Sequence, residues 1–248
     1  GYRSMWGITT GGYNASLGHS SMYSLTTGDY NTAVGYNSLL TVSNGGLNTA
    51  IGYRSLELLT TGNNNTGLGG RALNSQTTAS DNTAVGQQAS RYNETGSNNV
   101  SVGYEALKGV SGNSHSNNTA IGYQSLNALT TGDSNVAVGY QSLRLATTGG
   151  YNIAIGHQSL DALVDGSSNV GVGTSALGAV TSGVGNVAMG ENAGSTAQTE
   201  SNNTYIGHNS GRNMDDGASN SALGYQSMMG ASTGNNALNN VAIGYQSL

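Results

Sequence analysis

The stretch NTAIGYQSL at residues 118–126, followed by NVAVGYQSL at 135–143, is the unit from which this chain is built. Its first Asn recurs fourteen times, and eleven of the thirteen intervals between successive copies are 17 residues. A fixed period this short is typical of a solenoid, in which one repeat cannot bury its own apolar face and stacking buries it instead. We number the repeat from this Asn, which lies at Asn14, Asn31, Asn48, Asn65, Asn82, Asn99, Asn118, Asn135, Asn152, Asn169, Asn186, Asn203, Asn220 and Asn240.

Positions 1 to 4 of the repeat predict a short strand. The Asn of position 1 is expected to hydrogen-bond to its own copy in the next coil. Position 4 is apolar in every copy, position 2 is mostly Thr or a β-branched aliphatic, and position 3 is Ala, Ser or Gly everywhere except at Tyr205. This pattern fits a strand with two unlike faces. We expect position 4 to form the buried aliphatic stack, so that Ile121→Asp would destabilise the fold, and position 3 to face away from it.

The rest of each coil is less regular. Position 5 is Gly in all fourteen copies, which suits a corner or a close backbone contact. Position 8 is Ser or Ala and is expected to be a small inner residue. Apolar residues at positions 9 and 12 are three apart, which fits either a bulged strand or one helical turn, and periodicity cannot separate the two. Position 15 is Gly in ten copies, often within Thr-Thr-Gly, and predicts the turn to the next Asn.

The composition supports one repetitive array over residues 1–248, with fourteen full repeats and a partial first one. The 248 residues include 40 Gly but no Pro, Cys or Phe, and only 8% are charged. The sequence begins at position 5 of one copy and stops at position 9 of another, so we expect it to be a piece of a longer fibre. Extra residues at 108–117 and 229–239 are expected to protrude without shifting the register of neighbouring coils.

Several classes of function find no support in these residues. The net charge is −5 with scattered cations, which argues against nucleic-acid binding. No apolar run approaches the roughly 20 residues of a membrane span, so this segment is not expected to insert into a membrane. His19, His157 and His208 share one position many coils apart, whereas a metal site needs convergence. No His–Asp pair accompanies the recurring Ser of position 8, so we expect neither an enzyme nor a bound cofactor.

The motif N-[TV]-A-[VI]-G-x-x-[SA] resembles the YadA-type head repeats of trimeric autotransporter adhesins, which run N-S-V-A-I-G-x-x-S. The longer N-T-A-I-G-Y-Q-S-L form also looks like repeats of phage tail fibres and related surface fibres. The resemblance implies a left-handed parallel β-roll, or β-solenoid, with three chains side by side around a three-fold axis. It also implies an extracellular location, on a cell surface or a virion fibre. The 17-residue period is longer than that of the family, and the added residues fall in positions 9–15.

The small residues of position 3 suggest where such a homotrimer would pack. A solvent-facing strand face has no reason to exclude large polar residues, whereas close approach of another backbone supplies one. We therefore expect the trimer axis to lie along Ala33, Ala50, Ala84, Ala120, Ala137, Ala154, Ala188, Ala222 and Ala242.

Position 6 offers a candidate surface-contact column. It is an aromatic ladder in most copies, made of Tyr36, Tyr53, Tyr104, Tyr123, Tyr140, Tyr225 and Tyr245, with the three His as substitutes. A stacked column that stiffens the coil competes with an exposed ladder for sugars or surfaces. We expect an adhesive or structural fibre segment whose partners are its own copies and a host-cell, glycan or matrix receptor. The alternatives are a purely structural surface filament and, on the Thr content, an ice-binding solenoid.

Overall fold

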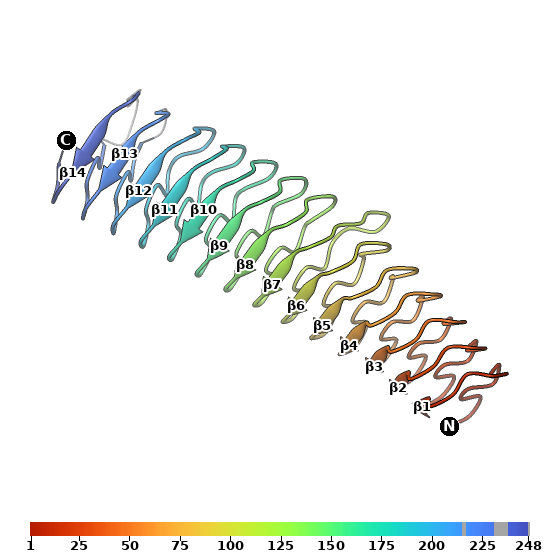
Figure 1. The fold of residues 1–248 in the computed structure, drawn as a ribbon. Helices are drawn as coiled ribbons and strands as arrows, with labels where there is room; N and C mark the ends of the chain where they lie inside the picture. The colour runs from red at the N-terminus through yellow and green to blue at the C-terminus, as the bar shows by residue number, and fades with distance from the viewer. Residues whose placement is uncertain (215–216, 231–237, 248) are drawn as a thin grey trace. The chain divides into compact units, whose positions relative to one another are not determined.

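The computed structural model describes the chain except for residues 215–216, 231–237 and 248. It is an all-β parallel solenoid of about 13 turns, with coils of about 17 residues, and the described part contains no helix. The chain divides into two compact units. The first comprises Gly1–Tyr123 and Leu129–Thr131, and the second Gln124–Ala128 and Gly132–Leu248. Within each unit the strands follow one another in chain order (Figure 1). The predicted fold class is thus confirmed as far as a parallel β-solenoid with this coil length.

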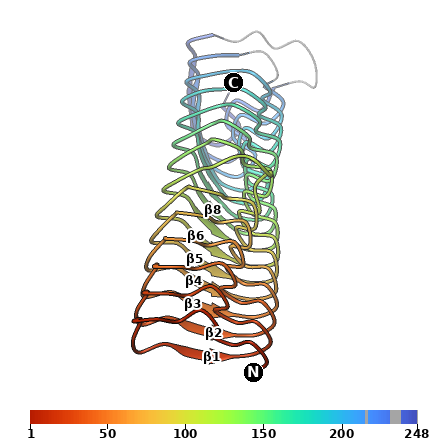
Figure 2. The same cartoon turned by 90° about the vertical axis from the view of Figure 1, so that its right-hand side faces the viewer.

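Each coil contributes one three-residue strand, formed by positions 2 to 4 as the sequence predicts. In the first unit these strands are β1 Ala15–Leu17, β2 Thr32–Val34, β3 Thr49–Ile51, β4 Thr66–Leu68, β5 Thr83–Val85, β6 Val100–Val102 and β7 Thr119–Ile121. In the second they are β8 Val136–Val138, β9 Ile153–Ile155, β10 Val170–Val172, β11 Val187–Met189, β12 Thr204–Ile206, β13 Ser221–Leu223 and β14 Val241–Ile243. Within each unit neighbouring strands are parallel, follow chain order and pair equivalent positions, as Ala33↔Ala50 and Ala137↔Ala154 do. Figure 2 shows β1 to β6 on one side of the coils.

The two faces of these strands lie opposite to our expectation. The Ala of position 3 points into the coil and is fully buried, as at Ala137 and Ala154. The aliphatic residues of position 4 point outward, and Ile121 and Ile155 are 39% and 41% exposed. The predicted aliphatic core at position 4 is therefore wrong. The interior needs a small residue here because the opposite wall of a 17-residue coil supplies the large ones.

Those large residues come from positions 9 and 12, which are buried together with the Ser of position 8. In the second unit, for example, Ser159, Leu160 and Leu163 are fully buried. A regular strand would send positions 8 and 9 to opposite faces. Here φ is positive at positions 7 and 9, 52° at both Gln158 and Leu160, and this local reversal turns both side chains inward. The segment is thus neither a bulged strand nor a helical turn, although it still bonds coil to coil, as Leu160 N donates to Ala176 O at 3.0 Å.

The Asn of position 1 forms the predicted stack, and it is buried inside each unit. The side-chain oxygen of Asn135 accepts from the backbone N–H and the side-chain amide of Asn152 at 3.0 and 3.1 Å. The same Asn152 amide donates to Gly166 O at 2.9 Å. Each Asn thus satisfies the turn of position 15 in its own coil and the backbone of the next, which explains why no other residue replaces it.

The Gly of position 5 forms the corner after the strand, where a side chain has no room. Gly156 has φ 134°, and a Cβ atom there would lie 2.5 Å from the backbone oxygen of Gly173. Both the positive φ and the contact exclude other residues. The predicted close backbone contact is confirmed.

The insertion at 108–117 leaves the register of the solenoid intact, as predicted. Its tip around Val110 is exposed, while the strands on either side keep the pairing Val100↔Thr119. The Asn stack also continues, because Asn118 N donates to the Asn99 side chain at 3.0 Å. The second insertion, 229–239, lies mostly outside the described residues.

One coil interior departs from the small-residue rule. Tyr205 occupies position 3 of β12 and is fully buried. The space for its ring comes from Gly194 and Gly211, which replace the Leu of position 9 on both sides of it. A Cβ atom at Gly194 would lie 2.6 Å from the Tyr205 ring, and one at Gly211 would overlap the ring on its other side. The exchange of large and small residues across the core keeps the coil filled.

Candidate surface-contact sites

The aromatic column of position 6 is both stacked and exposed. Neighbouring rings lie 5.0–5.7 Å apart, as in Tyr36–Tyr53, Tyr104–Tyr123 and Tyr140–His157. Apart from Tyr245 near the end of the chain, the seven Tyr of this column are 40–47% exposed. Because each ring covers the face of the next, the column presents ring edges and hydroxyls outward. A planar ligand cannot stack on a ring within it.

The column is interrupted within each unit. Gly70 and Gln87 take position 6 in two successive coils of the first unit, and Thr174 and Glu191 do so in the second. Arg71 follows Gly70, and its guanidinium lies 5.8 Å from the centre of the Tyr53 ring, which Arg54 also approaches at 5.2 Å. The Tyr53 ring therefore stacks on Tyr36 and, at this interruption, has two cations beside it in place of a further ring.

Amide side chains border the aromatic column at position 7. Gln158 donates to Gln141 at 3.3 Å, and Gln141 donates to Gln124 at 3.1 Å. Near the end of the chain, Gln246 donates to Gln226 at 2.8 Å. These bonds tie neighbouring coils together at the surface, so the polar surface of this edge is ordered from coil to coil.

The outward face of the sheet is the main apolar surface of each unit. Positions 2 and 4 project from it, and Ile51, Leu68 and Val100 in the first unit are 37–42% exposed. In the second unit Ile153, Ile155, Met189 and Leu223 are 38–48% exposed. An apolar hollow of about 230 Å³ lies on this face between Ile206, Leu223 and Ile243. The outward face is apolar at position 4 in every coil, a continuity that isolated exposed residues of a monomeric protein do not show.

The predicted trimer-axis residues do not lie on this face. Ala33, Ala50, Ala84, Ala120, Ala137, Ala154, Ala188, Ala222 and Ala242 are all at most 2% exposed in the single chain. They are enclosed by their own coil, so they cannot meet another chain. The pattern of small residues was read correctly as demanding close approach, but the close neighbour is the opposite wall of the same coil.

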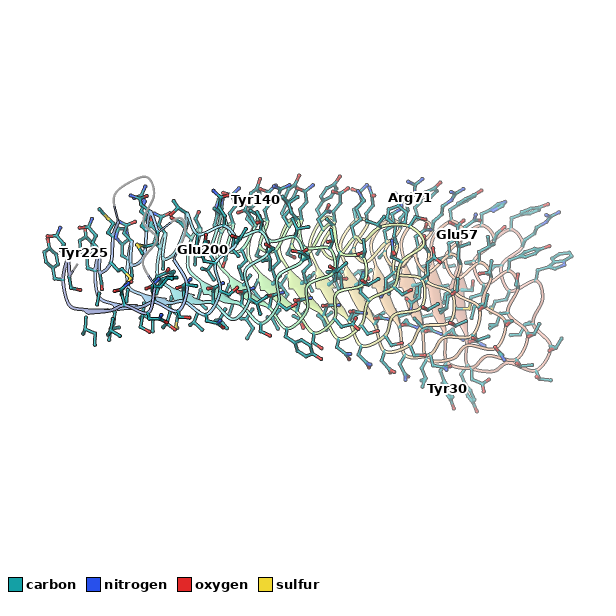
Figure 3. The ribbon with its side chains drawn as sticks, turned by 90° about the horizontal axis from the view of Figure 1, so that it is seen from above. Tyr30, Glu57, Arg71, Tyr140, Glu200 and Tyr225 are labelled. Carbon is teal, nitrogen blue, oxygen red and sulfur yellow. The ribbon has the colours of Figure 1, made fainter. Side chains whose placement is uncertain are left out.

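A second exposed group was missed by the sequence reasoning. Position 17, directly before each Asn, carries Tyr13, Tyr30 and Leu47 in three successive coils, and these are 82%, 56% and 58% exposed. The Tyr13 and Tyr30 rings stack 4.9 Å apart. Tyr30 projects from the side of the coils opposite to Arg71 (Figure 3). The sequence signal for this group is a bulky residue at a position that is otherwise mostly Asn, Ser, Asp or Gly. The bulky residues are only a minority at position 17, so the pattern was not noticed.

Burial displaces the pKa values of the Asp161 and Tyr205 side chains. Burial raises the pKa of Asp161 above its ordinary 3.8, and the Arg144 guanidinium partly opposes this shift. Burial, and then the charge of Glu200, raise the pKa of the Tyr205 hydroxyl. His208 lies 3.8 Å from the Glu191 carboxylate. Among the described residues no three His, Asp or Glu side chains gather as metal ligands, and no helix could cross a membrane.

Comparison with known proteins adds no relative. No family model, no curated protein and no solved structure matches this chain. Function must therefore be argued from the surfaces just described.

Proposed function

We propose that this chain is a structural and adhesive segment of an extracellular fibre, carried on a cell surface or a virion. In this proposal it assembles as a homotrimer through the outward face of its sheet and projects toward a surface or receptor. The observation that carries the proposal is the aliphatic character of position 4 in every coil, although this position points away from the core. A face of this kind is costly to leave in water and is typical of an interaction surface.

Copies of the same chain are the occupants that fit this face best. Successive coils pair equivalent positions, so the face presents an apolar residue of position 4 from strand to strand. A second copy lying parallel would therefore meet an apolar residue at each coil, and the interface would grow with the number of coils. The resemblance of the repeat to trimeric head repeats supports three copies. The aromatic column and the residues of position 17 then remain on the outside, available to a host-cell, glycan or matrix receptor.

Ice binding is less well supported by the same face. Four successive strands, β2 to β5, present Thr at position 2, beginning at Thr32 and ending at Thr83. Strands β8 to β11 of the second unit present Val136, Ile153, Val170 and Val187 there instead. A regular Thr array is thus confined to part of the chain, whereas the aliphatic residues of position 4 are present throughout. Thermal hysteresis in the wild-type chain would favour ice binding over assembly.

A pair of substitutions in one coil tests the assembly. Ile121→Asp places a charge on the outward face, where the side chain is 39% exposed in the single chain, so it should leave the coil folded and disrupt the trimer. Gln124→Asp, at the border of the aromatic column, should leave both intact. Sedimentation velocity gives the assembly state and circular dichroism the fold. An Ile121→Asp chain that sediments as the wild type does would refute the proposed interface.

A further inference from the structure

A shallow hollow of about 480 Å³ lies in the first unit, where positions 14–17 of three successive coils form an edge. Its walls are the side chains of Tyr30 and Leu47, and its polar lining includes Asp29, Asn44 and Asn63. The volume falls in the range of ligand sites, roughly 300–1,000 Å³. All five of these side chains are exposed, so the hollow is open to solvent.

The residue types at this edge are not those that the backbone prefers. Tyr30 and Leu47 both have φ 58°, in the left-handed region that costs most residues roughly 1–2 kcal/mol. Asn64 takes the same position and conformation in the next coil at little cost. The buried Leu of position 9 tolerates a positive φ because it fills the core, but Tyr30 and Leu47 are 56% and 58% exposed. Neither the core nor the turn explains them. Tyr151, at the same position in the second unit, has φ 60° and is 70% exposed, so this strain alone does not mark a ligand site.

The polar side chains of the hollow are held in place by the neighbouring coils. Asp29 Oδ1 accepts the backbone N–H of Gly12 at 2.6 Å, and Asn63 Oδ1 accepts that of Gly46 at 2.8 Å. Within the described chain, the second carboxylate oxygen of Asp29 and the amide nitrogen of Asn63 have no hydrogen-bond partner. One acceptor and one donor are thus oriented by a rigid backbone and left for a ligand.

From this combination we infer that the hollow binds a neutral carbohydrate. A sugar hydroxyl can donate to the Asp29 carboxylate and accept from the Asn63 amide, while the C–H face of the ring packs on Tyr30 and Leu47. Among the described residues no cation lines the hollow, and the Asp29 carboxylate repels anions, so an acidic or sulfated sugar fits poorly. Tyr13 covers one face of Tyr30, which holds the ring in a fixed orientation for a sugar at the hollow.

This inference rests on the proposed adhesive function and gives its receptor a chemical class. The apolar wall of the hollow ends with Leu47, because position 17 is Asn64 and Asp81 in the next two coils. The lining of the hollow contains no residue of positions 2 to 4, so the contact proposed for the trimer does not use it. The receptor contact is thus a local site and not a property of every coil.

The test uses the full chain on an array of neutral glycans ending in glucose, galactose, mannose or N-acetylglucosamine, together with sialylated and sulfated counterparts. Wild type should retain at least one neutral glycan. Asp29→Asn keeps an oxygen for the Gly12 N–H but removes the charge, and Tyr30→Asn suits φ 58°, so both variants should fold. Each should lower retention at least tenfold. Tyr151→Asn, at position 17 of the second unit, is the matched control and should change nothing.

Three results would overturn the inference: no neutral glycan retained by wild type, retention confined to anionic glycans, or an equal loss in Tyr151→Asn. The native mass of each variant separates this failure from failure of the proposed function. A trimer that binds no neutral glycan refutes only the carbohydrate site. A wild-type chain that is monomeric at every concentration refutes the proposed assembly, whatever the array shows.

Discussion

Replacing Asn152 by Ala should destabilise the second unit by several kcal/mol, although it removes only one neutral side chain. The Asn152 oxygen accepts both the backbone N–H and the side-chain amide of Asn169, at 3.0 and 3.1 Å. The Asn152 amide donates to Gly166 O at 2.9 Å and to the Asn135 side chain at 3.1 Å. All of these partners are in the buried interior.

The magnitude follows from the groups left behind. Asn152→Ala leaves the Asn169 backbone N–H and the Gly166 carbonyl buried and without these bonds. Each such group costs about 1–3 kcal/mol, so the expected loss is about 2–6 kcal/mol. Gln158→Ala in the same coil removes one surface bond to Gln141 and should cost less than about 1 kcal/mol.

Urea unfolding followed by circular dichroism measures this difference, with the chain concentration held fixed because assembly contributes to stability. Hydrogen exchange at the Asn169 amide gives a local reading and should accelerate strongly in Asn152→Ala. Equal losses in Asn152→Ala and Gln158→Ala, or an unchanged Asn169 exchange rate, would refute the role assigned to the Asn stack.

Three further changes test other side chains of the second unit. Gly211→Ala should destabilise the fold by about 1–3 kcal/mol, because the added methyl group overlaps the Tyr205 ring. In a double-mutant cycle, combining it with Tyr205→Ala should recover part of this loss. Additive losses would contradict the contact between residue 211 and the Tyr205 ring. Tyr205→Phe should raise the free energy of unfolding by about 1–3 kcal/mol, because the buried Tyr205 hydroxyl has no hydrogen-bond partner among the described residues. A loss of stability in urea would show that a partner exists. The pKa of Asp161 is raised in the fold, so ionisation of Asp161 should lower the free energy of unfolding as pH rises through and just above 3.8. The stability advantage of Asp161→Asn over wild type should therefore be larger at pH 7 than at pH 3. An advantage independent of pH would contradict the raised pKa.

Much of the fold could be predicted because the repeat imposes strict rules on single positions. The invariant Asn and the Gly of position 5 each have one physical solution, a side-chain stack and a corner without room for a Cβ atom. The strand over positions 2–4 followed from its β-branched residues. These predictions did not depend on knowing which way the chain turns between strands.

The inside and outside of the strand could not be predicted in the same way. Alternation shows that positions 3 and 4 lie on opposite faces of the strand, but it does not show which face is buried. The apolar character of position 4 favoured that position as the buried one. Ile155 is nevertheless exposed, because Leu160 and Leu163 on the opposite wall fill the narrow interior and leave space only for Ala154. That outcome depends on the positive φ at Gln158 and Leu160, which residue type does not signal.

The candidate site shows the same limit. The aromatic column was found because Tyr recurs at one position, and its exposure agrees with a surface role. The hollow at Tyr30 and Leu47 escaped notice because it depends on a few exceptional residues in adjacent coils. A bulky residue where Asn or Gly is usual, such as Tyr30, is the signal that could have found it.

Native mass spectrometry of the wild-type chain tests the central claim most directly. If the outward aliphatic face joins three copies, the assembled mass should be three times the chain mass of 25.0 kDa. The trimer should persist on dilution to low micromolar concentration, as expected for an interface that extends over many coils. A mass of 25.0 kDa at every concentration would contradict the claim, because an apolar face of this length would then be left in water.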